Sequence, residues 1–400
     1  MNIIAKHLSM VKPSAVAVMS AKARALARQG KDIIRLTAGE PDFPAPAHVK
    51  MAAVKALADN QTKYPPVNGL TELREGICQK LERDNNLFYS PDQVIVSSGA
   101  KQVLFNALAV SLNPGDEVLL PTPYWMSYPA MVRINRGEPV FLPTKAETGF
   151  KLQAETLEAA ITPRTRWLLL NTPCNPTGAV YNKQELADLA GVLAKHPQVW
   201  VLSDDIYEYL VFDDARFESI LNAAPELAER TLVVNGFSKA YCIPGLRLGY
   251  GAGPAELTKG MFIIQTQSTS GACITSQWAG VAALAGDHSF VAANNQRYQK
   301  RRDFLVEKIN SIKGLSCATP KGAFYCLVYC EKFMGKTTPK GQIISSDEDL
   351  VGYLLEEACL AVVPGSPFGV SPFFRLSFAV SRKVLNEGVK RLEKAVSHFG

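Results

Sequence analysis

The sequence predicts an α/β protein in which helices cover both faces of a mostly parallel sheet, with a smaller α+β domain beside it. The chain has 400 residues, which is more than one hydrophobic core usually serves. Short, nearly continuous apolar runs alternate with helical patterns up to about residue 290, as is typical of buried parallel strands. Beyond that point strands and helices are mixed, which indicates a second domain.

The individual elements are expected in the following order. An N-terminal helix is expected over residues 15–29, in a segment with too little apolar surface for a core of its own. The larger domain is expected over residues 46–290, with strands at the apolar runs 93–97, 117–120, 166–171, 199–203, 231–235 and 247–251. The remainder predicts helices at 295–312 and 347–358, a strand at 322–328, a polar loop at 335–345 and a final helix.

Composition excludes several classes of protein. Hydrophobic residues are 47% and charged residues 20% of the chain, which is the balance of a folded protein. The 43 Lys and Arg exceed the 37 Asp and Glu only slightly and form no basic tail, so nucleic acid is not expected as a partner. The eight cysteines are dispersed without zinc spacing and are expected to be reduced. No apolar run is long enough for a membrane span or a signal peptide, so we expect a soluble, cytoplasmic protein.

Ligands of such sheets bind beyond the carboxyl ends of the strands, so the turns after the apolar runs are the candidate site. Ser97 to Gln102 follows the first run and opens a helix. Its small residues leave backbone N–H groups free to bind an anion such as a phosphate. The alternative is an ordinary strand-to-helix turn that binds nothing.

Two further turns carry polar side chains. Asn175 precedes Pro176, and the proline disfavours helical backbone angles at Asn175. The Asn175 amide could therefore be held in place for a ligand, although the segment could equally be a turn without chemistry. Asp204 and Asp205 follow another run. Adjacent acids can bind a metal, but no His or further acid follows at ligand spacing, so an acid facing a protonated ring nitrogen is the better interpretation.

A lysine and two arginines stand where charge is costly. Lys239 follows a buried-type strand, where desolvation lowers a lysine's pKa and makes it nucleophilic. Arg247 and Arg375 lie in apolar runs, where a charged side chain needs a negatively charged partner. That partner could be an anionic ligand or an acidic side chain of the protein itself.

Several other chemistries lack their residues. The sequence has no G-x-S-x-G, no H-E-x-x-H and no G-x-x-x-x-G-K-[ST]. The run from Gly249 to Gly253 is not a dinucleotide loop, because Pro254 stands where the third glycine belongs.

Taken together and in order, the motifs resemble those of the class I pyridoxal-phosphate-dependent aminotransferases. The segments that carry the resemblance are Thr37 to Phe43, Asn175 to Gly178, Ser203 to Tyr207, Ser238-Lys239-Ala240 and Gly245 to Gly249. More narrowly, the chain resembles a subgroup of bacterial aspartate aminotransferases. The motifs that carry this resemblance are Lys12-Pro13-Ser14, Lys63-Tyr64 and Gly99-Ala100-Lys101-Gln102. The resemblance runs from about Lys12 to the C-terminal helix.

The resemblance implies a fold-type-I transferase with a mostly parallel, seven-stranded sheet in the larger domain. It also implies that residues 1–45 join residues 291–400 in a discontinuous small domain, that the protein is a homodimer, and that no metal is bound. The implied function is ping-pong exchange of an amino group between an L-amino acid and a 2-oxo acid, with aspartate and 2-oxoglutarate as the leading pair.

The resemblance assigns a role to each motif residue. Lys239 would hold pyridoxal phosphate covalently and act as the catalytic base, while Asp204 would keep the ring nitrogen protonated. Tyr207 and Asn175 would bind the ring oxygen, and Trp125 would stack on the ring. The phosphate would be bound by Gly99, Ala100, Lys101, Ser238, Arg247 and Tyr64 of the partner subunit. The substrate would be bound by Arg375 at its α-carboxylate and by Gly39, Trp125, Asn175 and Lys101.

The sequence departs from the family pattern at two positions. Gly236 stands where some relatives have a phosphate-binding serine, and Val16 stands where related enzymes have a threonine near the distal carboxylate. The pocket could therefore accept aromatic or prephenate-like side chains, while Lys101 remains the cation for a distal carboxylate. A PLP-dependent β-lyase or racemase is the nearest alternative. A non-catalytic regulator is less favoured, since the resemblance leaves no room for an N-terminal DNA-binding element.

Overall fold

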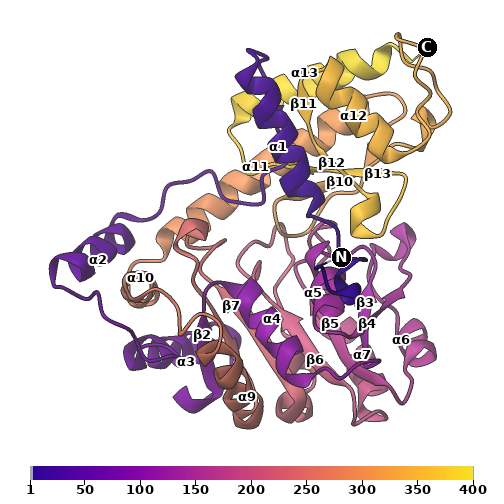
Figure 1. The fold of residues 1–400 in the computed structure, drawn as a ribbon. Coiled ribbons are helices and arrows are strands. Elements are labelled where there is room, and N and C mark those ends of the chain that lie inside the picture. Colours follow the sequence, from indigo (N-terminus) through magenta and orange to yellow (C-terminus); the bar gives the residue numbers. More distant parts are fainter. Residues whose placement is uncertain (1–2, 400) are drawn as a thin grey trace.

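The computed structural model describes residues 3–399 as a larger α/β part with a smaller part standing on one edge of it (Figure 1). Residues 1, 2 and 400, which the sequence analysis assigned to the smaller domain, lie outside the described residues. The predicted α/β class is confirmed. None of the helices between residues 3 and 399 is both long and apolar enough to cross a bilayer.

The main sheet has seven strands within residues 3–399, in the order β2-β8-β7-β6-β5-β3-β4. Strand β8 runs antiparallel to both neighbours, and the other described pairs are parallel. The strands are β2 (Val94–Ser97), β3 (Glu117–Pro121), β4 (Glu138–Leu142), β5 (Thr165–Asn171), β6 (Trp200–Asp204), β7 (Thr231–Gly236) and β8 (Gly249–Ala252). Each of the six apolar runs overlaps a strand of this sheet.

The sequence analysis did not predict the edge strand β4, for a physical reason. Leu142 is its buried residue, whereas the other four are exposed or half-buried, so the strand lacks an apolar run. Central strands are covered on both faces. In β5, Leu168 and Leu170 pack into one apolar cluster, while Trp167 and Leu169 pack into another on the opposite face.

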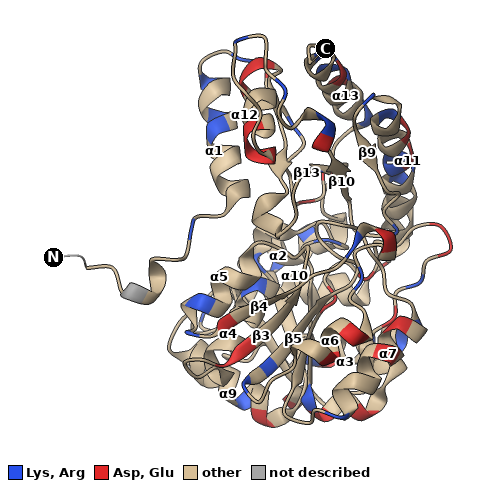
Figure 2. Ribbon diagram, turned by 90° about the vertical axis from the view of Figure 1, so that its right-hand side faces the viewer, with Lys and Arg blue, Asp and Glu red and all other residues tan. Residues whose placement is uncertain are grey.

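Helices cover both faces of this sheet, as Figure 2 shows from the side. The helices of the larger part are α2 (Ala47–Ala58), α3 (Thr71–Asn85), α4 (Ala100–Ser111), α5 (Ser127–Ile134), α6 (Ala154–Ala160), α7 (Lys183–Ala194), α8 (Ile220–Ala223), α9 (Ala255–Thr266) and α10 (Ile274–Ala285).

The smaller part combines both ends of the chain. Strand β1 (Ile34–Arg35) pairs in parallel with β11 (Leu360–Ala361). Met19, Ala23 and Leu36 share an apolar cluster with residues from 298 onward, and three residues between 207 and 212 join the same cluster. Its helices are α1 (Ala15–Arg28), α11 (Ser289–Ser311), α12 (Asp347–Glu357) and α13 (Arg382–Ser397). Its remaining strands are β9 (Ser316–Cys317), β10 (Tyr325–Tyr329), β12 (Val363–Pro364) and β13 (Phe373–Ser377).

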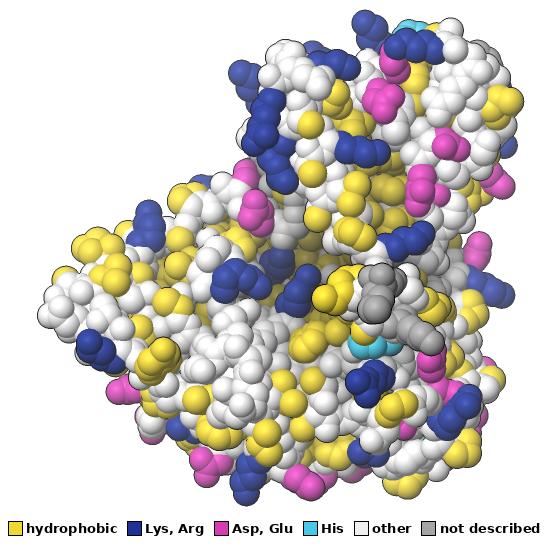
Figure 3. Space-filling model, in the orientation of Figure 1, with side chains coloured by type: hydrophobic (Ala, Val, Ile, Leu, Met, Phe, Trp, Pro, Cys, Tyr) yellow, Lys and Arg dark blue, Asp and Glu magenta, His cyan; other side chains and the backbone are white. Residues whose placement is uncertain are grey.

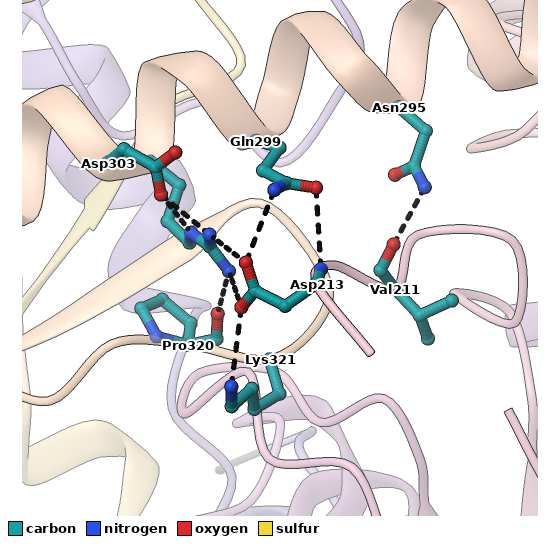
Figure 4. A network of polar contacts seen from close by, with 8 residues as sticks. Val211, Asp213, Asn295, Gln299, Asp303, Pro320 and Lys321 are labelled. Atoms are coloured by element: carbon teal, nitrogen blue, oxygen red, sulfur yellow. Dashed lines mark hydrogen bonds and ion pairs between the residues drawn. The ribbon is translucent and has the colours of Figure 1, made fainter. Parts of the chain in front are cut away.

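A polar network joins α11 to the loop that follows β6 (Figure 4). Arg302 is buried and donates from both terminal nitrogens to the Asp213 carboxylate at 2.8 Å. Gln299 contacts the Asp213 backbone and carboxylate, and Asn295 donates to the Val211 carbonyl at 2.7 Å. Because α11 belongs to the smaller part, these bonds attach the loop at residues 205–213 of the larger part to the smaller part.

We expect Arg302→Met to lower the free energy of unfolding by about 2 kcal/mol, because it removes the buried guanidinium that donates to the Asp213 carboxylate and to the Pro320 carbonyl. The measurement is guanidinium unfolding of the cofactor-free protein. Lys321→Met is the matched control, since Lys321 contacts the same carboxylate at 3.3 Å but is 56% exposed, and it should cost less than about 1 kcal/mol. Equal losses in the two variants would contradict this interpretation of the network.

Candidate functional site

A cavity of about 390 Å³ lies where the carboxyl edge of the main sheet meets the smaller part. Figure 3 shows the surface hollowed there, with basic side chains beside the hollow. Its size is that of a small-molecule site. The predicted residues that line it are Gly39, Ala100, Lys101, Trp125, Asn175, Asp204, Tyr207, Ser238, Lys239, Arg247 and Arg375. Gly99 borders it through Arg247, whereas Tyr64 lies elsewhere and is 93% exposed.

Strand direction explains this gathering. Asp204 ends β6, and Lys239 follows the end of β7, so both reach the same edge of the sheet. Strand β8 runs the opposite way, so Arg247, two residues before the start of β8, also lies at that edge. The sequence analysis placed Arg247 inside a strand, which is wrong. Arg247 precedes β8, is exposed, and donates to the Pro244 carbonyl at 2.9 Å.

Lys239 is largely buried and its Nζ donates to the Gly39 carbonyl. Its Nζ lies 5.4 Å from the ring centre of Tyr207 and 5.7 Å from that of Phe324. Burial, reinforced by the Arg375 charge, lowers the pKa of the Lys239 amine to about 8. A substantial fraction of this amine is therefore neutral and nucleophilic near physiological pH.

Asp204 is a buried carboxylate held by a tyrosine. The Tyr128 hydroxyl donates to Asp204 Oδ2 at 2.6 Å, and both residues are buried. Burial raises the pKa of Asp204 to about 6, while the Tyr128 hydrogen bond and the Lys239 charge oppose that rise. Oδ1 has only a long contact, 3.4 Å from the Ile206 N–H, which leaves it available to a cationic ligand.

Arg375 is a buried cation with no carboxylate within 4 Å among residues 3–399. Its terminal nitrogens donate to Asn175 Oδ1 at 2.8 Å and to the Thr37 carbonyl at 3.1 Å. Its Nε has no hydrogen-bond partner in that part of the chain. The guanidinium lies 4.2 Å from the ring centre of Tyr325 and 4.9 Å from that of Phe368. A planar buried cation of this kind suits a carboxylate ligand.

The opposite end of the cavity is suited to an anion. Gly99 caps α4 with φ +87°, and a Cβ there would lie 2.5 Å from an Arg247 terminal nitrogen. Only glycine therefore lets Arg247 approach the free N–H groups of α4. Lys101 lies over the Trp125 ring at 4.6 Å, and burial together with Arg247 lowers its pKa.

Gly236 also has a structural reason to be glycine. A Cβ at this position would lie 2.9 Å from the Gly249 Cα and 3.0 Å from the Leu248 carbonyl oxygen. The close approach of β7 and β8 thus excludes a side chain there. Val16 lines the cavity together with Ser14.

Sequence reasoning missed two tyrosines that line the cavity, Tyr128 and Tyr325. Both are fully buried, and in the sequence each stands among apolar residues, so each looks like a core aromatic. The usable signal was the hydroxyl itself, because a buried tyrosine hydroxyl generally has a hydrogen-bond partner. Tyr128 bonds to Asp204, and Tyr325 bonds to Tyr207 at 2.8 Å.

These groups fit pyridoxal phosphate. A buried, partly neutral lysine can react with its aldehyde, a buried carboxylate can face its ring nitrogen, and the α4 N-terminus with Arg247 can take its phosphate. The Nε of Arg375 has no hydrogen-bond partner among residues 3–399 and could donate to a carboxylate ligand.

Comparisons with known proteins agree with this geometry. The family model for class I and II aminotransferases matches residues 31–392. The aspartate/prephenate aminotransferase of Cereibacter sphaeroides is 50% identical over 98% of both chains. The solved aspartate aminotransferase of Rhizobium meliloti is 48% identical over both whole chains, with a TM-score of 0.97. That of Thermus thermophilus with maleate is 40% identical, covers 99% of this chain and all of its own, and has a TM-score of 0.92.

The state of Lys239 can be tested in the cofactor-free protein. Acylation of Lys239 by an amine reagent, followed by peptide mass spectrometry, should show a pH midpoint near 8, because burial favours the neutral amine. Asp204→Asn should lower that midpoint, since the Asp204 charge favours the ammonium form.

The matched control is Asp205→Asn. Asp205 is equally buried, but unlike Asp204 it is not among the charges that shift the pKa of the Lys239 amine. This variant should leave the Lys239 midpoint unchanged. A midpoint above 10 in the unmodified protein, as exposed lysines show, would contradict the buried environment assigned to Lys239.

Proposed function

The chain belongs to the class I and II aminotransferases, and we propose that it transfers the amino group of aspartate to 2-oxoglutarate and also accepts prephenate as an amino acceptor. It is a pyridoxal-phosphate-dependent aminotransferase. The observation that carries it is a single cavity in which Lys239, Asp204 and Arg375 meet without pairing with one another.

Lys239 holds the cofactor and moves the proton at the substrate Cα. When bound, pyridoxal phosphate supplies an electron sink that makes loss of this proton feasible. The lowered pKa of Lys239, about 8, keeps its amine competent both to bind and to accept a proton near neutral pH. Asp204 faces the ring nitrogen with the carboxylate oxygen that Tyr128 leaves free, and holds a proton there.

Tyr207 and Asn175 bind the ring oxygen, and Trp125 packs on the face of the ring. Tyr207 and Asn175 are buried at the cavity wall, so their hydrogen bonds are little weakened by water. Trp125 contacts Tyr128 edge to face at 5.3 Å, which orients its ring beside Asp204. Together these residues would hold the ring of the cofactor in the cavity.

The phosphate is held by the backbone of Gly99, Ala100 and Lys101, by Ser238, and by Arg247. The N-terminus of α4 and the adjoining guanidinium support this assignment. Tyr64 of the partner subunit completes the site. This last role requires a homodimer, since Tyr64 is 93% exposed and does not line the cavity of its own chain.

An exposed apolar face supports the homodimer. On α2, Met51, Val54 and Leu57 are between 56% and 63% exposed, and Figure 3 shows hydrophobic side chains gathered on the projection that carries this helix. Apolar patches of this kind on a folded protein mark association surfaces. A second copy of the chain is the occupant we propose.

Arg375 binds the substrate α-carboxylate as a bidentate pair, which places Cα above the ring. Gly39 and Asn175 line the same end of the cavity. We assign residues 1–45 and 291–400 to one domain that closes over the substrate, and residues 46–290 to the other. The β1–β11 pairing and the shared apolar cluster support this division.

Lys101 and Val16 decide the side-chain preference. Aspartate and prephenate each carry a second carboxylate, which Lys101 can bind at the cavity rim. Val16 and Trp125 supply apolar surface that a purely acidic pocket would lack, and this favours acceptance of the prephenate ring. The relatives named aspartate/prephenate aminotransferase support the same pair. The eight free cysteines support a cytoplasmic location.

A panel of amino donors tests the proposal. Given one donor alone, the enzyme should convert the aldehyde form of its cofactor to the amine form, and bleaching of the aldehyde band should be faster with aspartate and glutamate than with phenylalanine. Prephenate should then restore the aldehyde band. Ammonia release with the aldehyde band retained would instead identify a β-lyase.

Lys101→Met, assayed with the same amino donors, tests whether Lys101 binds the distal carboxylate of the substrate. Loss of one charge-assisted contact should raise KM for aspartate about 30-fold, while alanine, which has no distal carboxylate, serves as the control donor and should be unaffected. An equal loss for both donors would contradict the role of Lys101.

A further inference from the structure

Tyr325 joins two parts of the candidate site that belong to different segments of the chain. It lies on β10 and is fully buried. Its hydroxyl is 2.8 Å from the Tyr207 hydroxyl, and its ring lies 4.2 Å from the Arg375 guanidinium. A Cβ on Gly39 would be 3.2 Å from the same hydroxyl. Tyr325 thus contacts residues on both sides of the cavity.

The direction of the proton between the two hydroxyls follows from counting donors. Each tyrosine hydroxyl carries one proton, and neither hydroxyl has another hydrogen-bond partner within residues 3–399. One proton therefore occupies the shared bond and the other is free. If Tyr325 donates, the free proton belongs to Tyr207, which lines the cavity and can direct it at a ligand oxygen.

The surrounding charges favour Tyr325 as the donor. The Arg375 cation lies on the Tyr325 ring, where it opposes the rise in pKa that burial causes. Burial also raises the pKa of Tyr207, and there the Arg375 charge, which lowers it, is opposed by the Asp204 carboxylate, which raises it. The more acidic hydroxyl donates, so the hydrogen-bond chain runs from Tyr325 to Tyr207 and on into the cavity.

We propose that Tyr325 is a positioning residue, whose hydroxyl orients the Tyr207 proton toward the bound cofactor and whose ring supports the Arg375 guanidinium. This inference rests on the proposed function, because it takes Tyr207 and Arg375 as the groups that contact the cofactor oxygen and the substrate carboxylate. A chain of two hydroxyls strengthens the final hydrogen bond. It therefore stabilises negative charge on that oxygen.

Tyr325→Phe tests the hydroxyl, because it keeps the ring under Arg375. The readout is the pH midpoint of the visible absorbance of the bound cofactor, which reports charge stabilisation rather than turnover. The midpoint should rise by about half a unit, as loss of one neutral hydrogen bond implies. KM for aspartate should stay within about twofold of the unmodified enzyme. Tyr325→Leu removes the ring as well, and should also raise KM about tenfold.

Tyr298→Phe is the matched control. Tyr298 is buried in the same apolar cluster, its ring is 5.7 Å from that of Phe324, and its hydroxyl has no hydrogen-bond partner within residues 3–399. This variant should leave the absorbance midpoint unchanged. A midpoint that stays constant or falls in Tyr325→Phe, or that moves equally in Tyr298→Phe, overturns the inference. Failure of the proposed function is distinct, because the unmodified protein would then show no donor-dependent bleaching.

Discussion

Burial of unpaired charges at one sheet edge is the constraint on which the rest of the structure depends. Lys239, Asp204 and Arg375 all line one cavity, and none of them has an oppositely charged side chain within 4 Å among residues 3–399. Each charge loses hydration without the compensation of an ion pair. The apolar clusters of the two parts must supply the free energy that holds this arrangement. A cofactor with an aldehyde and a ring nitrogen, together with a substrate carboxylate, would relieve it.

Two features of the fold bring these charges together: the direction of the strands and the contacts between the larger and smaller parts. Parallel strands bring Asp204 and Lys239 to one edge, and the reversed strand β8 adds Arg247. The smaller part adds Arg375 from β13. Contacts that cross between the two parts then set the spacing. These include the hydrogen bond from Arg375 to Asn175, the pair formed by Tyr207 and Tyr325, and the network around Arg302. These contacts link the residues that we propose bind the substrate to those that we propose bind the cofactor.

Much of the fold could be predicted because central strands are buried on both faces and so have uninterrupted apolar runs. Strand β4 could not, since an edge strand with one buried residue has no such run. Strand ends located Lys239, Asp204 and Asn175, and the family resemblance supplied their roles. Tyr128 and Tyr325 were missed because an aromatic residue in an apolar segment looks the same whether its hydroxyl is idle or bonded. Arg247 was misplaced because the apolar run begins two residues before the strand.

Covalent trapping tests the central assignment, that Lys239 is the residue that holds the cofactor. The protein is loaded with pyridoxal phosphate, reduced with borohydride, digested, and its labelled peptide is sequenced by mass spectrometry. The buried, partly neutral amine of Lys239 predicts a single adduct on the peptide containing Ser238-Lys239-Ala240. An adduct that maps to any other lysine, or no adduct in a protein that still binds the cofactor, would contradict this assignment.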